Sequence, residues 1–163
     1  RGPRRPLAPN RGHSGNHANM IPTTTLIFAA CAALVNLWLG IRCGRIRSTA
    51  KISHGDGGNV LLQRRMRAQL NFAENTPLIV ILVLLLEVSL NHPLWLTIIA
   101  IVYIAVRICH ALGMDAESDS VLRMIGTAGT MLITIGLVVM ALLTGYGVIG
   151  GAIAAPASIA TPV

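Results

Sequence analysis

The long uncharged stretches of this chain set the strongest limit on its fold. Residues 124–163 contain no charged side chain, and residues 21–41 form a second uncharged run. About 20 apolar residues in a helix cross a bilayer, whereas about 25% of the residues in soluble domains are charged. This chain has 163 residues, of which 12% are charged and 53% hydrophobic. The sequence therefore predicts an all-α integral membrane protein without a separate soluble catalytic domain.

Four membrane spans follow from the apolar runs and the breaks between them. The first covers residues 21–41, and the second begins near Asn59, a suitable N-cap, with a polar first half. The sequence at 91–93, Asn-His-Pro, ends the second span, the third covers 94–113, and the fourth runs from about 123 to 148. We therefore expect a four-transmembrane-helix bundle over residues 20–150, with both polar connections at one end.

The two ends of the chain are predicted to lie outside this membrane domain. Residues 1–19 are rich in Pro, Gly, Arg and Asn and have no apolar period, which indicates disorder. They are interpreted as a mistaken start or an expression scar, with a functional basic arm as the alternative. Residues 151–163 are small and interrupted by Pro, and we expect a frayed tail.

The positions of the basic residues predict the orientation in the membrane. Seven of them lie between residues 42 and 67, around the first polar connection, and the connection at 91–93 has no Lys or Arg. The positive-inside rule then places both polar connections in the cytoplasm and both termini outside.

Two further classes of function are excluded by composition. The formal net charge is +7, but aromatic residues make up only 4% of the chain and do not alternate with the basic ones, so nucleic-acid binding is not expected. Cys31, Cys43 and Cys109 form no CxxC pair and no Cys/His spacing typical of a metal site. Neither a disulfide framework nor a bound metal is predicted.

Polar side chains recur at helical spacing near one predicted membrane surface. Such rows occur on the second helix, on the third helix and at the start of the fourth: Arg64, Arg67, Asn71, Glu74 and Leu78; Tyr103, Arg107, His110 and Met114; and Arg123. An ionisable residue at membrane depth costs about 2.5–3.5 kcal/mol, so each should face protein or ligand. We expect these rows to line one pocket with surplus positive charge, suited to an anion that carries an amine or amide. In the alternative, Glu74 pairs with Arg107 and the other arginines reach lipid phosphates.

Glu87 lies deeper in the second span, with no Lys or Arg nearby in the sequence. We expect it to face another helix or the opposite interface and to have a structural role. If the chain is instead a small transporter or channel subunit, Glu87 is its proton site. His92 is interpreted as a loop histidine.

The stretch RMRAQLNFAENTPL at residues 65–78 resembles the signature of the MAPEG family, the membrane-associated proteins in eicosanoid and glutathione metabolism. The pattern is Arg, three residues, Asn, two residues and Glu, followed by Pro, at Arg67, Asn71, Glu74 and Pro77. GDGGN at 55–59 resembles the bacterial branch, RICH at 107–110 resembles the third-helix segment, and Arg123 stands where the family has a catalytic arginine. The resemblance covers residues 21–148.

This resemblance implies a homotrimer of four-helix subunits in a bacterial inner membrane, with glutathione sites between subunits on the cytoplasmic side. It implies that Arg123 stabilises the glutathione thiolate and that six residues contact glutathione: Arg45, Arg67, Asn71, Glu74, Arg107 and His110. The second substrate is then a lipophilic electrophile or hydroperoxide that enters from the membrane lipids. Guanidinium groups for the two carboxylates of glutathione and a carboxylate for its ammonium are the expected chemical complement.

The sequence departs from the family pattern at two positions. Asn75 follows Glu74 where members often have Tyr, and Ala111, Leu112 and Met114 follow His110 where another Tyr is common. Loss of these rings removes stacking and hydroxyl contacts. Either glutathione binds more weakly, or a related thiol replaces it, or the fold persists without activity. The last case is a non-enzymatic trimeric scaffold whose basic pockets bind anionic lipid head groups.

Overall fold

The computed structural model of the protein describes residues 21–117 and 120–150. These residues form four α-helices and no strand: α1 (Thr23–Ala50), α2 (Val60–Ser89), α3 (Leu94–Gly113) and α4 (Val121–Gly145). Each helix is long and apolar enough to cross a membrane. The predicted all-α, four-span fold is confirmed. The predictions for residues 1–19 and 151–163 fall outside the described residues.

The boundaries of α2, α3 and α4 lie within three residues of those predicted from the sequence. The third span was predicted at its observed bounds, and the Asn59 side chain accepts a hydrogen bond from the backbone N–H of Leu62 at 2.9 Å, as an N-cap does. Helix α1 continues beyond its uncharged run to Ala50 and ends where Lys51 adopts a left-handed φ of 54°. The fourth helix begins and ends two to three residues earlier than predicted.

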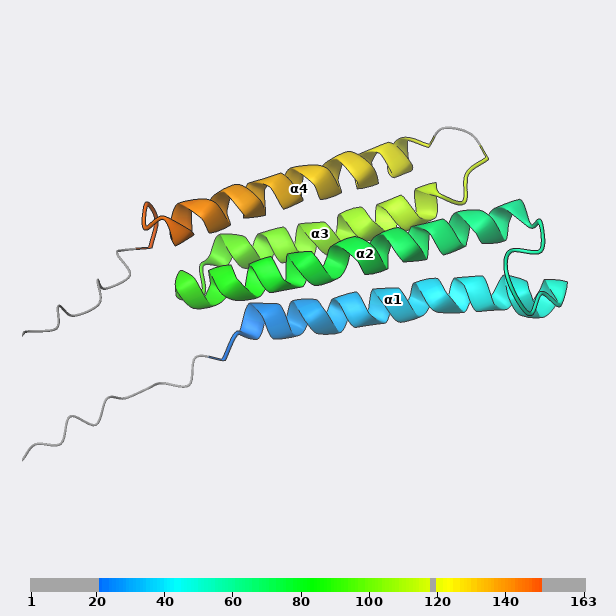
Figure 1. Cartoon of the computed structure of the whole chain (residues 1–163), viewed down its shortest axis with the longest axis horizontal. Coiled ribbons are helices and arrows are strands. Elements are labelled where there is room, and N and C mark those ends of the chain that lie inside the picture. The colour runs from blue at the N-terminus through cyan, green and yellow to red at the C-terminus, as the bar shows by residue number, and fades with distance from the viewer. Residues whose placement is uncertain (1–20, 118–119, 151–163) are drawn as a thin grey trace, which may run out of the picture.

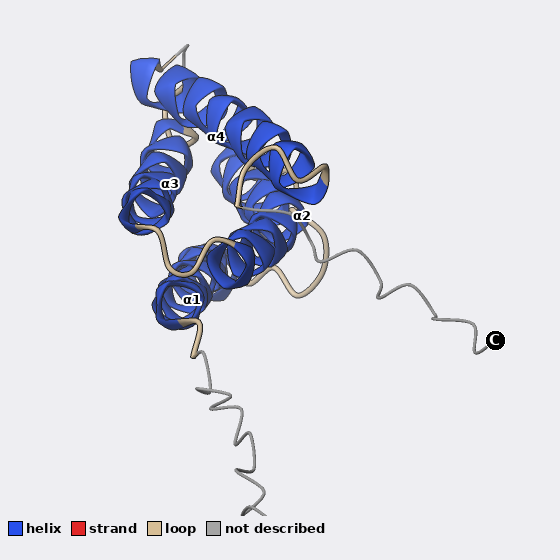
Figure 2. Ribbon diagram, turned by 90° about the vertical axis from the view of Figure 1, so that its left-hand side faces the viewer, coloured by secondary structure: helices blue, strands red, loops and turns tan. Residues whose placement is uncertain are grey.

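The helices run alternately up and down, which gives the bundle two distinct ends (Figure 1). The loop end carries residues 51–59 and the connection between α3 and α4. The turn end carries residues 90–93, the start of α1 and the end of α4. Both polar connections therefore lie at one end, as predicted. The view in Figure 2 shows α1 and α4 on opposite sides of the bundle, and these two helices make no contact within the described residues.

Two apolar clusters fill the interior, one in each half of the bundle. The cluster towards the turn end joins all four helices and includes Phe28, Val83, Tyr103 and Leu137. The cluster towards the loop end joins α1, α2 and α3 around Leu39 and Phe72. Large apolar side chains also cover the outside of every helix, as the lipid environment of a bilayer requires. The chain is an integral, multi-pass membrane protein.

Two glycines allow α3 and α4 to touch along their backbones at the loop end. A Cβ atom on Gly113 would lie 2.2 Å from the backbone nitrogen of Arg123, and one on Gly126 would lie 2.4 Å from Cβ of His110. No larger side chain fits at either position without separating the helices. The start of α4 is consequently fixed against the end of α3.

Glu87 holds the turn end together from inside the bundle. Its fully buried carboxylate accepts hydrogen bonds from the backbone N–H groups of Thr24 and Thr25, both at 2.8 Å, and from the Thr25 hydroxyl at 2.7 Å. His92 Nδ1 lies 2.9 Å from the same carboxylate. Since the first N–H groups of a helix lack partners within it, Glu87 completes the start of α1 from α2. The prediction that Glu87 faces another helix is confirmed. His92 lies in the loop, as predicted, and also contacts the Glu87 carboxylate.

Replacement of Glu87 by Ala should lower the free energy of unfolding by about 2–3 kcal/mol, because buried donors lose a charged acceptor. Denaturant titration of the detergent-solubilised protein, followed by far-ultraviolet circular dichroism, measures this change. Glu117→Ala is the matched control, since Glu117 is exposed at the other end of the bundle. Equal stability of the two variants would contradict the capping role.

Candidate functional site

The loop-end half of the bundle holds all the residues that the sequence singled out for binding or catalysis. Helices α1 and α3 end there, and α2 and α4 begin there. The site residues lie within about 15 residues of those helix ends: Arg45 on α1; Arg67, Asn71 and Glu74 on α2; Arg107 and His110 on α3; and Arg123 on α4. The helical order therefore brings to one end residues that are up to 78 positions apart in the sequence.

The polar row of α2 faces away from the bundle. Arg67 and Glu74 are exposed, Asn71 is half-buried, and Leu78 at the end of the row is 64% exposed. No hydrogen bond or ion pair joins Arg67 or Glu74 to another described residue. The two opposite charges stand two helical turns apart, about 10 Å along the axis, on one outward face. On α1, Arg45 is also exposed.

The polar row of α3 faces the interior instead. Arg107 is 2% exposed, its guanidinium carbon lies 5.5 Å from the centre of the Phe72 ring, and its Nη1 donates to the Thr130 hydroxyl at 3.4 Å. The Nε atom of Arg107 is buried without a hydrogen-bond partner in the described structure. A buried guanidinium with neutral neighbours only is costly, which marks Arg107 as a group suited to an anion.

Two expectations from the sequence are corrected by this geometry. The rows of α2 and α3 do not line one pocket within a single subunit. Met114 lies with Arg64 and Arg67 at one groove, but Arg107 and His110 are buried inside the bundle and Glu74 is exposed outside it. The alternative pairing of Glu74 with Arg107 is also absent: Glu74 is exposed, and Arg107 packs on Phe72 and Thr130. Helical spacing identified each row, but spacing alone does not fix how a helix is rotated against its neighbours.

Arg123 and His110 lie side by side across the α3–α4 contact. The Thr127 hydroxyl donates to the backbone carbonyl of Arg123 at 2.9 Å and lies 3.3 Å from His110 Nδ1. The two glycine contacts described above place the backbone of Arg123 against Gly113. A guanidinium and an imidazole are thus brought to the same corner of the loop end.

A groove of about 750 Å³ runs between α1 and α2 at the loop end. Three guanidinium groups and no carboxylate line it, and its remaining walls are Gln, Met, Leu, Ala and Cys side chains. The charged members are Arg47, Arg64 and Arg67. A cavity with this lining attracts an anion that also has an apolar part.

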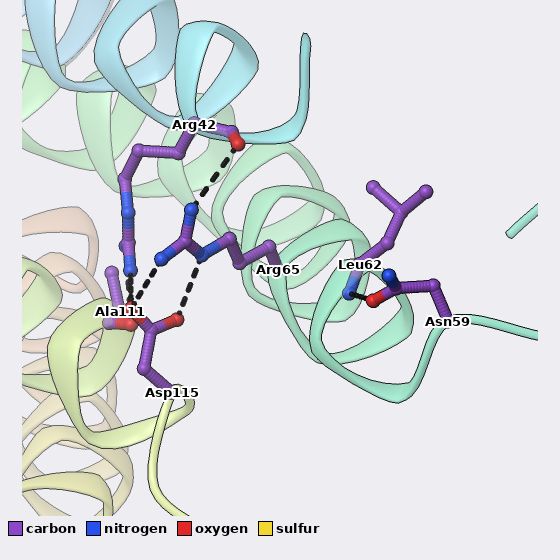
Figure 3. Close-up of polar contacts among 6 residues, drawn as sticks. All are labelled: Arg42, Asn59, Leu62, Arg65, Ala111 and Asp115. Atoms are coloured by element: carbon purple, nitrogen blue, oxygen red, sulfur yellow. Dashed lines mark hydrogen bonds and ion pairs between the residues drawn. The ribbon is translucent and has the colours of Figure 1, made fainter. Parts of the chain in front are cut away.

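An ion cluster at the loop end, shown in Figure 3, was not foreseen from the sequence. The Asp115 carboxylate forms an ion pair with Arg42 and accepts two hydrogen bonds from Arg65, from Nε at 3.1 Å and from Nη2 at 3.0 Å. Arg42 also donates to the backbone carbonyl of Ala111 at 3.2 Å, and Arg65 donates to that of Arg42 at 3.3 Å. The cluster joins α1, α2 and the end of α3.

The two positions that depart from the family pattern have local roles. The Asn75 side chain donates to the backbone carbonyl of Asn71 at 2.8 Å, which satisfies it within α2. Met114 is the C-cap of α3 and contributes to the lining of the groove between α1 and α2. Neither side chain supplies the hydroxyl that a Tyr would bring.

The fold and the site together define a multi-pass membrane protein with a cation-rich end. The chain belongs to the MAPEG family, whose model matches residues 25–143. A comparison with individually curated proteins finds no match. Membership makes this chain a membrane protein of the family that acts in eicosanoid and glutathione metabolism.

The ionisation of Asp115 predicts how stability depends on pH. Burial raises the pKa of this carboxyl, but the hydrogen bond from Arg65 and the charges of Arg42 and Arg65 outweigh burial and hold the pKa below its ordinary value. An unperturbed Asp side chain, as in the unfolded chain, has a pKa of about 3.9. Because the pKa of Asp115 is lower in the folded protein, its ionised form stabilises the fold above about pH 3.9, and this stabilisation is lost as the pH falls.

The melting temperature in detergent should therefore fall as the pH is lowered below about 4, and Asp115→Asn should reduce that dependence. Thermal unfolding followed by circular dichroism at several pH values measures both. An Asp115→Asn variant with the full acid dependence of the parent would contradict this role for the cluster.

Proposed function

We propose that this protein is a membrane-embedded, glutathione-dependent transferase, with peroxidase activity when the second substrate is a hydroperoxide. The observation that carries the proposal is the outward face of α2, where Arg67 and Glu74 follow the MAPEG pattern. Both side chains are exposed and lack partners in the described structure. A cation and an anion held about 10 Å apart complement a peptide that carries both carboxylates and an ammonium.

Each residue of this proposal has a task set by its chemistry. Arg67 and Arg45 bind the carboxylates of glutathione, Glu74 binds its ammonium, and Asn71 binds an amide of the peptide. In this proposal Arg107 and His110 also belong to the site, from α3, and they reach it from inside the bundle and not from the outward face of α2. The unsatisfied Nε of Arg107 supports a role in anion binding, because a ligand carboxylate would supply the missing acceptor.

The outward direction of the α2 row favours a site between subunits. Charged side chains at membrane depth are costly when they face lipid, and a neighbouring subunit is the partner that covers them. We therefore propose a homotrimer in which glutathione lies between the α2 face of one subunit and its neighbour. The site opens towards the cytoplasm of a bacterial cell, as the basic residues at the loop end predict.

Arg123 is proposed to stabilise the glutathione thiolate. A free thiol has a pKa of about 8.5 and is mostly protonated at neutral pH, whereas the thiolate is the nucleophile. Lowering the thiol pKa by about 2 units requires about 2.7 kcal/mol, which one positioned guanidinium supplies. The thiol gives its proton to water. The thiolate then attacks the electrophilic carbon of a lipophilic substrate that enters from the bilayer. A carbon–sulfur bond forms, and the bond from that carbon to its leaving group breaks, so that the leaving group departs with the electron pair.

A second candidate function is supported by the groove between α1 and α2. Its three guanidinium groups and apolar walls also suit an anionic lipid head group with its acyl chains. In that case the protein is a non-enzymatic trimeric scaffold that binds anionic lipids. A proton-transport role for Glu87 is not favoured, because backbone, hydroxyl and imidazole groups already occupy its carboxylate.

Titration of the detergent-purified protein with glutathione at neutral pH, followed by thiolate absorbance in the ultraviolet, tests the proposal. The parent should form thiolate saturably. Arg123→Ala should reduce the ionised share of bound thiol from about three quarters to about 3% at pH 7, the change expected for two pKa units. The trimer should remain intact on size-exclusion chromatography.

Lys51→Gln is the matched control, since it removes one exposed positive charge at the loop end from a residue assigned no task. It should behave as the parent does. A flat titration of the parent with an intact trimer would overturn the transferase proposal in favour of the lipid-binding scaffold. Equal thiolate in the parent and in Arg123→Ala would exclude Arg123 as the stabilising group.

A further inference from the structure

The loop-end half of α4 packs against α3, and the apolar cluster at the loop end contains no residue of α4. Helix α4 makes no contact with α1 in the described structure. The α4 residues buried in the apolar core are Ile133 and Leu137, and Ile133 lies ten residues beyond Arg123, about 15 Å along the helix. The position of Arg123 is therefore set mainly by two links. The first holds the start of α4 to the end of α3, and the second holds the end of α3 to the rest of the bundle.

The first of these links is the backbone contact at the two glycines. Gly113 leaves room for the backbone of Arg123, and Gly126 leaves room for His110. Any movement of the last turn of α3 is consequently transmitted to Arg123, because the two segments touch without an intervening side chain.

The second link is Asp115, which follows the last turn of α3 directly. Its backbone N–H donates to the carbonyl of Leu112 at 3.2 Å, so the residue is still part of the helix end. Its carboxylate is bound by Arg42 from α1 and in a two-pronged manner by Arg65 from α2 (Figure 3). Arg42 is 8% exposed and stacks on the Trp38 ring at 4.7 Å, so the guanidinium itself is held in place.

We infer that Asp115 is a positioning residue, which fixes Arg123 relative to α1 and α2 by fastening the end of α3 to Arg42 and Arg65. The connection runs from the two guanidinium groups to Asp115, from Asp115 to Gly113, and from Gly113 to Arg123. The inference rests on the proposed function, because that function gives Arg123 its task. It goes beyond that function by assigning a role to Asp115, which contacts no proposed ligand-binding residue.

The charge of Asp115 has a second consequence for the same site. Arg42 and Arg65 both belong to the basic stretch, and Asp115 binds both. Arg45 and Arg67 point outward. Without Asp115, two further guanidinium groups would compete for the ligand carboxylates, so an uncharged residue at this position disturbs both the location of Arg123 and the binding of the anion.

The distance between α1 and α4 at the loop end tests the inference without any ligand. Spin labels at Thr49→Cys and Met124→Cys, both exposed positions, are placed in full-length protein whose three native cysteines are replaced. Labelled chains are mixed with an excess of unlabelled chains, and the distance distribution is measured by pulsed electron paramagnetic resonance. Asp115→Asn should broaden or shift this distribution, whereas Asp115→Glu should restore a narrow one.

Glu117→Gln is the matched control, because it removes an exposed acid two residues further along the chain. It should leave the distribution unchanged. If Asp115→Asn does not fold, Arg65→Lys keeps the charge but loses the two-pronged geometry, and it should broaden the distribution. A distribution identical to that of the parent in whichever of these variants folds would overturn the inference.

The thiolate titration separates this inference from the proposed function. Asp115→Asn should raise by about one unit the pH at which half of the bound glutathione is ionised. A purely structural role would lower the amount of bound glutathione without moving that pH, and such a result would overturn the link to Arg123. If the parent forms no thiolate, the proposed function fails, while the label distances still decide whether Asp115 positions α4.

Discussion

The loop end of this protein depends on one carboxylate shared between two arginines. Apolar surfaces give little preference for one helix arrangement over another inside lipid, so polar contacts and close packing decide how membrane helices assemble. Asp115 joins α1, α2 and α3 through Arg42 and Arg65. At the turn end, Glu87 joins α2 to the start of α1 in a comparable way. Two of the six acidic residues in the chain thus form polar contacts that join helices.

The division of the charged residues between inside and outside gives the loop end its chemistry. Asp115 forms ion pairs with Arg42 and Arg65, whereas Arg107 is buried among neutral groups. Arg67 and Glu74 face outward from α2, where no described residue binds them. A subunit arranged in this way has a surplus of positive charge directed at its surroundings. In the proposed function, an anionic ligand and a neighbouring subunit satisfy these groups.

Much of the fold could be predicted from the sequence because the membrane imposes a simple rule. Apolar runs and the breaks between them gave four spans, and Asn59 and the 91–93 break located the two ends of α2. The end of α1 was predicted at residue 41 but lies at Ala50. The MAPEG signature also follows from local spacing, since Arg67, Asn71 and Glu74 belong to one helix. In each case the signal lies in residues that are close together in the chain.

The tertiary part of the site could not be predicted in the same way. Whether the α2 row faces α3 depends on helix rotation, which is set by packing around Phe72 and Tyr103. The Asp115 cluster joins residues 50 and 73 positions apart, and Asp115 was one of three acids in a polar connection. The pairing of His92 with Glu87 was not predicted, because it requires the backbone to turn back at residues 91–92, where both φ angles are positive.

The central claim is that the outward face of α2 binds glutathione against a neighbouring subunit. Electron cryomicroscopy of the protein in lipid nanodiscs with glutathione tests it most directly. The account predicts a trimer with tripeptide density between subunits, its ammonium at Glu74 and a carboxylate at Arg67, with the sulfur towards Arg123. Lipid head-group density in that place, or an α2 face that contacts only acyl chains, would contradict it.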